Sequence, residues 1–427
     1  MGASLMKKPV TWHLIPDTSC QPTQPIPTNL HLSCKLDTMK KTLSFVSLLM
    51  AAAMILPSCD ISFSNRRDPE TIDLKFKSAE IIEADQQFAF ELFNQVCSLN
   101  NSENIMISPI SVSYALGMTY NGAAGTTQEA FENVLHFTGL TKQEVNDSYK
   151  DLVGQIIGLD PKVELSMANS IWYREGANVL ETFKTVNQTY FDAAVEELDF
   201  SDPGAVDIIN NWIEDKTNDK IQDMLDEIPA GAYMYLINAI YFNATWLYEF
   251  DKADTYTGSF QMEDNTTMDA DFMVVEGSFY RTANMYYSAV ELPYGDSAFS
   301  MVAILPSENT DLSSFISEYS VQDWNQRAVY SAPVKVKIEL PKFSYGFKDL
   351  LNDPLINLGL GNAFSDAADF SNITLETDLF ISRVIHQSFI DVNEKGTEAA
   401  AATIVEMKEN AVQTETVSFN RPFMYII

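Results

Sequence analysis

The sequence predicts an α+β fold in which helices pack around large, mostly antiparallel β-sheets. Helical patterns are concentrated early in the chain and long strand patterns dominate later, without the regular alternation that builds a parallel sheet. No internal repeat or long linker follows about residue 70, which indicates one large domain. The 46% hydrophobic and 20% charged residues are typical of a globular protein.

An export signal precedes this domain. Residues 39–58 combine two lysines with an apolar run over residues 43–56 and a small-residue exit. The apolar run is too short to span a bilayer as a helix. Its end, LPSC, resembles the lipobox of bacterial lipoproteins, in which the cysteine is acylated, so we expect a lipid anchor at Cys59.

The signal divides the chain into four parts. We expect residues 1–38 to be a misread upstream extension, with a long leader as the alternative, because this segment would bury the charged start of the signal. Residues 59–74 would then form a tether, and residues 75–427 the folded domain. The mature protein is expected to be exported and held by lipid in a bacterial envelope, in the periplasm or at the cell surface.

The charge argues against a nucleic-acid partner, and the cysteine content argues against an internal disulfide. The net charge of −32 is spread along the chain and repels phosphate backbones, so we expect no nucleic-acid partner. Cys20 and Cys34 belong to the leader and Cys59 would carry lipid, which leaves no second cysteine to form a disulfide with Cys97. We therefore expect no internal disulfide, and stability that comes from packing.

The predicted helices come first in the domain. Residues 79–99 have a regular apolar face, and Ser108-Pro109 is typical of a helix start. The apolar face consists of Phe88, Leu92 and Val96. Two capping boxes, each a threonine followed three residues later by a glutamate, predict further helix starts. They are Thr126 with Glu129 and Thr141 with Glu144. A later helix is expected near residues 203–217.

Strand patterns follow, because apolar and polar residues begin to alternate with a period of two. They cover residues 163–173, 233–246, 299–305 and 334–340. In the last of these, four aliphatic residues alternate with Lys335, Lys337 and Glu339. These strands are long for a small domain.

The sequence contains no recognisable catalytic constellation. Past the signal only His136 and His386 remain, and there is no nucleophile elbow, zinc-binding histidine pair, phosphate-binding loop or cysteine pair at metal spacing. His386 alternates with Val384 and Ser388 on a predicted strand, where a lone histidine is more often a buried, hydrogen-bonded group than a general base. We expect neither an enzyme nor a cofactor or metal site.

The stretch EKGTEAAAAT, residues 394–403, follows a strand pattern and is rich in small side chains. Alanine favours helices and Thr397 could cap one, so a surface helix is one reading. The β-branched Thr403, Ile404 and Val405 instead favour an extended chain. The residues alone leave both readings open.

This stretch resembles the reactive-loop hinge of the serpins, the serine protease inhibitor superfamily. Other stretches resemble serpin motifs in family order. They are NIMISPISVSYAL (104–116), INAIYFNATWLYEF (237–250), VELPY (290–294), ELPKF (339–343), FSDAADFS (364–371) and FNRPF (419–423). Together they cover nearly everything from about residue 75 onward, and the resemblance implies a serpin fold with an exposed reactive-centre loop.

The resemblance implies suicide-substrate inhibition of serine endopeptidases, with cysteine endopeptidases as a further class. After the loop is cut, its hinge side enters the main sheet while the protease is still attached by an acyl bond. About a dozen new ladder hydrogen bonds, at roughly 1 kcal/mol each, would outweigh the ordering of the loop. The hinge residues so implied are Glu394, Gly396, Thr397, Glu398, Ala399, Ala400, Ala401, Ala402 and Thr403. Gly396 would be the pivot, and Thr397, Ala399, Ala401 and Thr403 would face inward.

The resemblance also implies roles for polar residues near the opening of the sheet. A cluster beneath the opening strands would consist of Ser108, Ser111, Asn238 and His386. Lys342 and Glu394 would form an ion pair at the top of the opening, close to Trp246. The scissile bond would join Asn410 to Ala411, with Met407 or Lys408 as alternative positions. The implied partner is the target protease in a covalent complex with a monomer.

Serpins continue beyond the motif that FNRPF resembles, so we expect the domain to be truncated at its C-terminus and its activity to depend on what replaces the missing strand.

Three alternatives to inhibition follow from the same residues. A non-inhibitory serpin, acting as a carrier or a structural surface protein, is the main alternative. A lipid-anchored binding module with the same fold comes next, and a hydrolase last.

Overall fold

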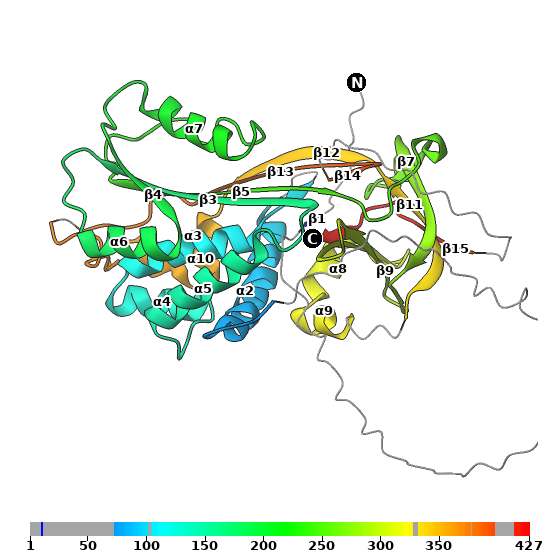
Figure 1. Ribbon diagram of the computed structural model, residues 1–427, viewed down its shortest axis with the longest axis horizontal. Helices are drawn as coiled ribbons and strands as arrows, with labels where there is room; N and C mark the ends of the chain where they lie inside the picture. The colour runs from blue at the N-terminus through cyan, green and yellow to red at the C-terminus, as the bar shows by residue number, and fades with distance from the viewer. Residues whose placement is uncertain (1–9, 12–71, 101–103, 328–331, 377, 398–413) are drawn as a thin grey trace, which may run out of the picture. The chain divides into compact units, whose positions relative to one another are not determined.

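The computed structural model describes residues 10–11, 72–100, 104–327, 332–376, 378–397 and 414–427 (Figure 1). By its internal contacts the chain divides into one unit of residues 1–16 and 68–427 and a second unit of residues 17–67, which lies outside the described residues. The expected signal and the lipidation candidate Cys59 fall in that second unit.

The main sheet has six strands in the order β12-β13-β14-β5-β3-β4. They are β3 (Val163–Arg174), β4 (Ala193–Leu198), β5 (Met234–Thr245), β12 (Phe343–Leu350), β13 (Ile385–Asn393) and β14 (Gly396–Thr397). All neighbours are antiparallel except β3 and β4. The predicted strands over residues 163–173 and 233–246 are confirmed, since β3 and β5 occupy them.

Helices cover both faces of this sheet, unequally (Figure 1). Those on one face are α2 (Ser78–Leu99), α3 (Pro109–Gly122), α4 (Gly125–Val134), α5 (Lys142–Ile156), α6 (Glu181–Tyr190) and α10 (Asn352–Leu358). The other face carries α7 (Ala205–Lys216), which packs on it through Ile209 and Ile213. The predicted apolar face of α2 is confirmed, because Phe88, Leu92 and Val96 are fully buried.

One of the two predicted capping boxes is wrong. Thr141 and Glu144 form a complete box at the start of α5. Helix α4, by contrast, begins at Gly125, which places Thr126 inside its first turn with no capping role. The cause is tertiary: the Ala124 N–H donates to the Asp369 carbonyl, and the Thr126 hydroxyl accepts from Asn362, so this helix start is set by a distant segment.

Two four-stranded sheets complete the fold, with strand orders β16-β10-β9-β8 and β15-β11-β7-β6. Their strands are β6 (Tyr256–Gln261), β7 (Thr267–Phe279), β8 (Arg281–Ala283), β9 (Tyr287–Tyr294), β10 (Phe299–Pro306), β11 (Val334–Pro341), β15 (Glu415–Ser418) and β16 (Met424–Ile426). The expected strands over residues 299–305 and 334–340 are therefore confirmed. The remaining elements are β1 (Val10–Thr11), which pairs with β2 (Ile105–Met106), and the short helices α8 (Leu312–Glu318), α9 (Val321–Arg327), η1 (Lys252–Asp254) and η2 (Leu360–Phe364).

The fold class is the predicted one, α+β with mostly antiparallel sheets. Immediately past the end of β5, Trp246 forms a bridge with Tyr294, the last residue of β9. The main sheet and the β9 sheet therefore meet at the end where the hinge lies. In the part of the chain that is described, no helix is both long enough and apolar enough to cross a bilayer.

Candidate functional site

The hinge enters the main sheet as a short central strand. β14 pairs antiparallel with β13 on one side and with β5 on the other. The register places Gly396 opposite Asn393 and Thr245, and Thr397 opposite Val392 and Ala244. These two residues are thus extended, as one of the two readings of the hinge requires. Among the described residues no ladder joins β5 directly to β13, so β14 is the seam between the two halves of the sheet.

Gly396 permits the close approach of β14 to β5. A Cβ atom at this position would overlap the carbonyl oxygen of Ala244 and lie 2.7 Å from the Cα of Thr245. Those atoms are backbone and cannot turn away as a side chain could. The structure therefore gives the narrow space between the two backbones as the physical reason for glycine here, and the pivot role stays a prediction.

Thr397 lies in a buried aromatic pocket. Its hydroxyl is 2.7 Å from the hydroxyl of Tyr294, and both residues are almost completely buried. The Trp246 ring stacks on the Tyr294 ring with centroids 4.3 Å apart, and Phe242 meets Tyr294 edge to face. Burial raises the pKa of Tyr294, so its hydroxyl keeps its proton at physiological pH.

An ion pair closes the top of this pocket. The Lys342 ammonium lies 3.1 Å from a carboxylate oxygen of Glu394, which also accepts from the Thr255 hydroxyl. Burial acts to raise the pKa of Glu394, but a backbone hydrogen bond, the Lys342 ammonium and the Thr255 hydroxyl hold that pKa below its ordinary value. The indole N–H of Trp246 donates to the Asn393 carbonyl. The proximity of Trp246, Lys342 and Glu394 expected from the sequence is therefore present.

The four polar residues expected beneath the opening strands lie in contacting pairs. The Ser108 backbone N–H donates to His386 Nε2 at 3.1 Å, and the Ser111 hydroxyl donates to the Asn238 side-chain carbonyl. Because Nε2 accepts a hydrogen bond, His386 holds its proton on Nδ1 and is a buried, neutral imidazole. The Asn238 amide in turn donates to Asn169 of β3 at 2.6 Å, a residue that the sequence analysis missed.

A segment that we call the strap, residues 217–228, follows α7 and crosses the sheet on the face opposite α3. The Gln387 amide donates to the Gln222 carbonyl, and Lys348 of β12 donates to the Asp223 carbonyl. Arg383 pairs with Glu227 at 3.2 Å. The strap is thus tied to β12, to β13 and to the chain just before β13.

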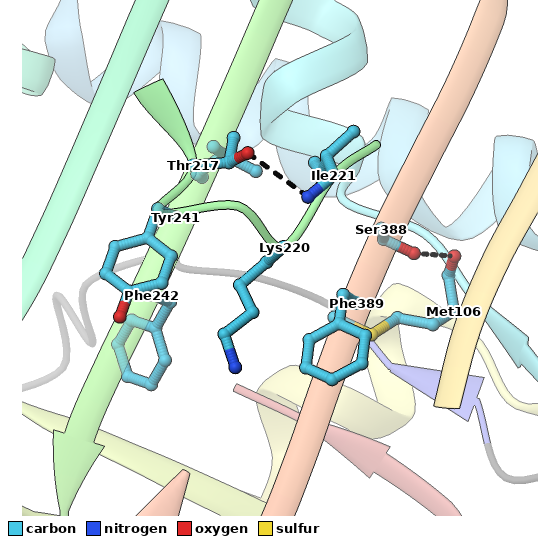
Figure 2. A pocket seen from close by; sticks show the side chains of 9 residues that line it. Met106, Thr217, Lys220, Ile221, Tyr241, Phe242, Ser388 and Phe389 are labelled. Atoms are coloured by element: carbon cyan, nitrogen blue, oxygen red, sulfur yellow. Dashed lines mark hydrogen bonds between the residues drawn. The ribbon is translucent and has the colours of Figure 1, made fainter. Parts of the chain in front are cut away.

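A small cavity lies beneath the strap, between β5 and β13 (Figure 2). Lys220 extends into this space between Tyr241 and Phe389, with its ammonium 5.1 Å from the centre of the Phe389 ring. The cavity volume is about 20 Å³, which suits a water molecule or two but no organic ligand.

No group of three potential metal-ligating side chains occurs among the described residues. The hydrogen bonds of Ser108 and Ser111 tie the start of α3 to β13 and β5, and the Asn238 amide joins β5 to β3. Among the residues that the structure describes, the facing edges of β5 and β13 are joined only through β14.

Several predicted residues fall outside the described part of the chain. They are Glu398, Ala399, Ala400, Ala401, Ala402, Thr403, Met407, Lys408, Asn410 and Ala411. Tyr294, Thr255 and Asn393 contribute to the site but were not among the residues predicted from the sequence. Tyr294 ends the stretch VELPY, and a tyrosine at the end of an apolar strand is the one signal that could have marked it as a buried hydrogen-bonding group.

Comparisons with known proteins agree with the architecture. A family model described as "Serpin (serine protease inhibitor)" matches residues 83–427. A serpin-like protein of Methanosarcina acetivorans is 36% identical over 360 residues, which are 82% of this chain and 84% of that protein. The crystal structure of tengpin, a thermophilic serpin in the native state, is similar with a TM-score of 0.74 and 32% identity, covering 84% of this chain and 92% of tengpin. Human thyroxine-binding globulin complexed with thyroxine is similar with a TM-score of 0.74 and 26% identity, covering 82% of this chain and 94% of the globulin.

Proposed function

Because the chain belongs to the serpin family, we propose that it inhibits serine endopeptidases as a suicide substrate, and cysteine endopeptidases by the same acyl chemistry. The bait is the segment between the hinge and β15, with Asn410–Ala411 as the scissile bond and Met407 or Lys408 as alternative cleavage positions. The protein contributes no catalytic group. It contributes a sheet that accepts its own cleaved loop.

The observation that carries this proposal is the position of β14. Two residues of the hinge already pair with both β13 and β5. A segment that continued in the same direction would find β5 on one side and β13 on the other, with their backbone groups available to it. Each added residue would gain ladder hydrogen bonds that neither strand makes with the other among the described residues.

The register supports the same reading. Each step along the hinge moves the paired residue one position back on both flanking strands, so Thr403 would lie opposite Asn238 and His386. Asn238 and His386 point toward α3, where they contact Ser111 and Ser108. Thr397, Ala399, Ala401 and Thr403 would then all lie on the α3 side of the sheet, where Thr397 contacts Tyr294 and where close packing requires small residues.

The chemistry follows from this geometry. The serine oxygen of the protease loses its proton and bonds to the scissile carbonyl carbon, the peptide C–N bond breaks, and the leaving nitrogen takes up the proton and stays with β15 as a new amino end. The acyl-enzyme remains attached to the hinge side. Entry of that side between β5 and β13 carries the protease along the sheet and distorts it before water can hydrolyse the ester.

A carrier role is the competing proposal. One structural relative is a thyroxine-binding globulin in complex with thyroxine, so a serpin fold can serve ligand binding. The small residues of the hinge favour inhibition, because a carrier has no need of a loop that fits inside a sheet. We also propose that a lipid at Cys59 holds the protein in a cell envelope, where it would act on proteases that reach that surface.

The test of inhibition is a covalent complex. Incubated with trypsin, elastase and subtilisin in turn, the protein should form with at least one of them a complex of summed mass that survives denaturing electrophoresis. Thr397→Arg should abolish the complex and leave clean cleavage, because a guanidinium would have to be buried beside Tyr294. Mass spectrometry of the reaction identifies both products.

Glu398→Arg is the matched control for this substitution. It introduces the same side chain one position later, which in a continued strand would lie on the opposite face beside Asn243 and Asp391, both only half-buried. The complex should persist in this variant. Clean cleavage of the parent protein by every protease would contradict inhibition, and equal loss in both arginine variants would contradict the assignment of the inward face.

A further inference from the structure

We propose that three exposed apolar side chains around Phe279 form a docking surface for the target protease, and that this surface suits an endopeptidase whose own surface is basic. We call these residues, Tyr248, Tyr280 and Val334, the Phe279 patch. The proposal rests on the proposed function, because it names the class of protease that meets the bait.

The fold groups the three residues of the Phe279 patch. Phe279 is buried at the end of β7. Val334 is its partner in the ladder of β7 and β11, Tyr280 follows it in the chain, and the Tyr248 ring meets the Phe279 ring edge to face with centroids 5.5 Å apart. Tyr248, Tyr280 and Val334 are 42%, 44% and 46% exposed. Single exposed apolar residues are normal on a protein surface, whereas apolar residues gathered in one place more often mark an interaction surface.

The C-terminal end of the bait is fixed beside this patch. Arg281, the residue after Tyr280, donates two hydrogen bonds of 2.7 Å to the Glu415 carboxylate. Glu415 begins β15 and pairs with β11 two residues beyond Val334. The loop therefore returns to the folded body within one or two residues of the Phe279 patch.

A protease that cuts the bait has this patch within reach of its own surface. Four residues separate the proposed scissile bond from Glu415, and six separate the Lys408–Glu409 bond from it. At about 3.3 Å per residue these segments span at most about 13 Å and about 20 Å. A protease domain of about 200 residues has a radius of gyration of about 16 Å, so its body extends over the surface around Glu415.

The charge of the protein selects among proteases. The net charge is −32, and exposed carboxylates flank the patch on neighbouring strands. They are Glu415 on β15 and Asp269, Asp271 and Glu276 on β7. These four outnumber the two cations that pair with them, Lys335 and Arg281. Such a surface attracts a basic partner, repels an acidic one and raises the association rate with the basic one by about tenfold or more at low salt.

The experiment uses two trypsins of opposite charge, one cationic and one anionic, which both cut after lysine and therefore both act at Lys408. The second-order rate constant is measured for loss of trypsin activity and for cleavage of the loop, at salt concentrations from about 10 mM to about 1 M. Cleavage of a synthetic peptide of residues 404–414 by each enzyme corrects for their intrinsic difference.

After this correction, cationic trypsin should react at least about tenfold faster than anionic trypsin at the lowest salt concentration. The two rates should agree within about threefold at the highest, because salt screens the charges. Tyr280→Ser should lower the rate constant for cationic trypsin about tenfold at every salt concentration, because an aromatic contact with the enzyme is lost.

Tyr286→Ser is the matched control. Tyr286 is also exposed, to 65%, but it lies past the end of β8 that is opposite Arg281. This variant should react as the parent does. Equal losses in the two serine variants, an unchanged rate in Tyr280→Ser, or equal rates of the two trypsins at low salt would overturn the proposal.

Loop cleavage separates this inference from the proposed function. If the loop is cut and no covalent complex forms, inhibition is wrong, and the rates of cutting still decide the docking surface by the same comparisons. If a complex forms at rates that neither the charge of the trypsin nor Tyr280→Ser changes, inhibition stands and the docking surface is wrong. If neither trypsin acts on the loop, Lys408 is not presented to a protease beside the patch, and the docking surface is again wrong.

Discussion

At the scale of single residues, Asp85 is the most unusual group in the helical layer. It lies on α2 and is 4% exposed, with one carboxylate oxygen accepting from the Tyr149 hydroxyl at 2.8 Å. Its other oxygen has no hydrogen-bond partner among the described residues. Burial raises the pKa of Asp85 to about 7, although the hydroxyls of Tyr149 and Ser113 act to lower it.

The raised pKa fixes the direction of a pH effect. The folded protein binds the proton more tightly than the unfolded chain, so the stabilising contribution is fully present below about pH 4 and is lost as the pH rises toward about 7. Asp85→Asn removes this dependence. Its free energy of unfolding relative to the parent should rise by roughly 2 kcal/mol between about pH 5.5 and about pH 8, measured by urea denaturation.

Glu129→Gln is the control for this prediction. Glu129 is an exposed carboxylate on α4, so its removal changes the net charge by the same amount without touching a buried site. The difference in free energy of unfolding between the Glu129→Gln variant and the parent should be the same at both pH values. A constant difference between Asp85→Asn and the parent across this range would contradict the assignment of the raised pKa.

At the scale of elements, β14 depends on Gly396. An alanine there would place its Cβ against the backbone of β5. Gly396→Ala should therefore weaken the pairing of the hinge and raise the ratio of cleaved protein to covalent complex about tenfold, because overpacking costs about 1–3 kcal/mol. Gel densitometry of the protease reaction gives this ratio.

Gly346→Ala provides the comparison on a neighbouring strand. Gly346 lies on β12, where an added Cβ would have its nearest neighbour, the Ser388 carbonyl oxygen, at an ordinary 3.6 Å. This variant should inhibit as the parent does. Equal effects of the two alanines would show that loss of glycine flexibility, and not the approach to β5, is what matters.

Much of the element structure could be predicted from local pattern, and the failures have a common cause. Thr141 and Glu144 cap α5 because every group in that box lies within four residues. Thr126 does not cap α4, because Asn362 and Asp369, more than 200 residues away, engage the same turn. Local hydrogen bonds are readable in a sequence, but competition from a distant segment is not.

The residues of the candidate site also divide into those that could be identified from the sequence and those that could not. Lys342, Glu394 and the polar residues of the cluster were identified by resemblance to family motifs, and the structure brings them together as that resemblance implied. Tyr294 was part of a recognised motif but received no role, because its function depends on where β9 ends relative to β5. Only the packing of the main sheet against the β9 sheet shows which hydroxyl group the Tyr294 hydroxyl contacts.

At the scale of the whole molecule, β5 and β13 are joined only through the two residues of β14 in the part of the chain that the structure describes, so beyond β14 their facing edges make no ladder hydrogen bonds to each other there. Nicking the loop should raise the melting temperature by at least about 10 °C, because about a dozen ladder hydrogen bonds become available to the freed end. Differential scanning calorimetry of the nicked and intact protein measures this shift. Thr397→Arg is the internal control, since it should melt at the same temperature before and after nicking.

The two-residue seam also has a consequence for solvent access. Successive amides of an antiparallel strand point to opposite neighbours, so every second N–H of β13 faces β12 and the others face the opening. Deuterium uptake along β13 in the intact protein should therefore alternate between slow and fast from one residue to the next. In a molecule whose cleaved loop has entered the sheet, all β13 amides would be protected and the alternation would disappear. Deuterium uptake at each amide would therefore distinguish protein that has reacted with a protease from intact protein.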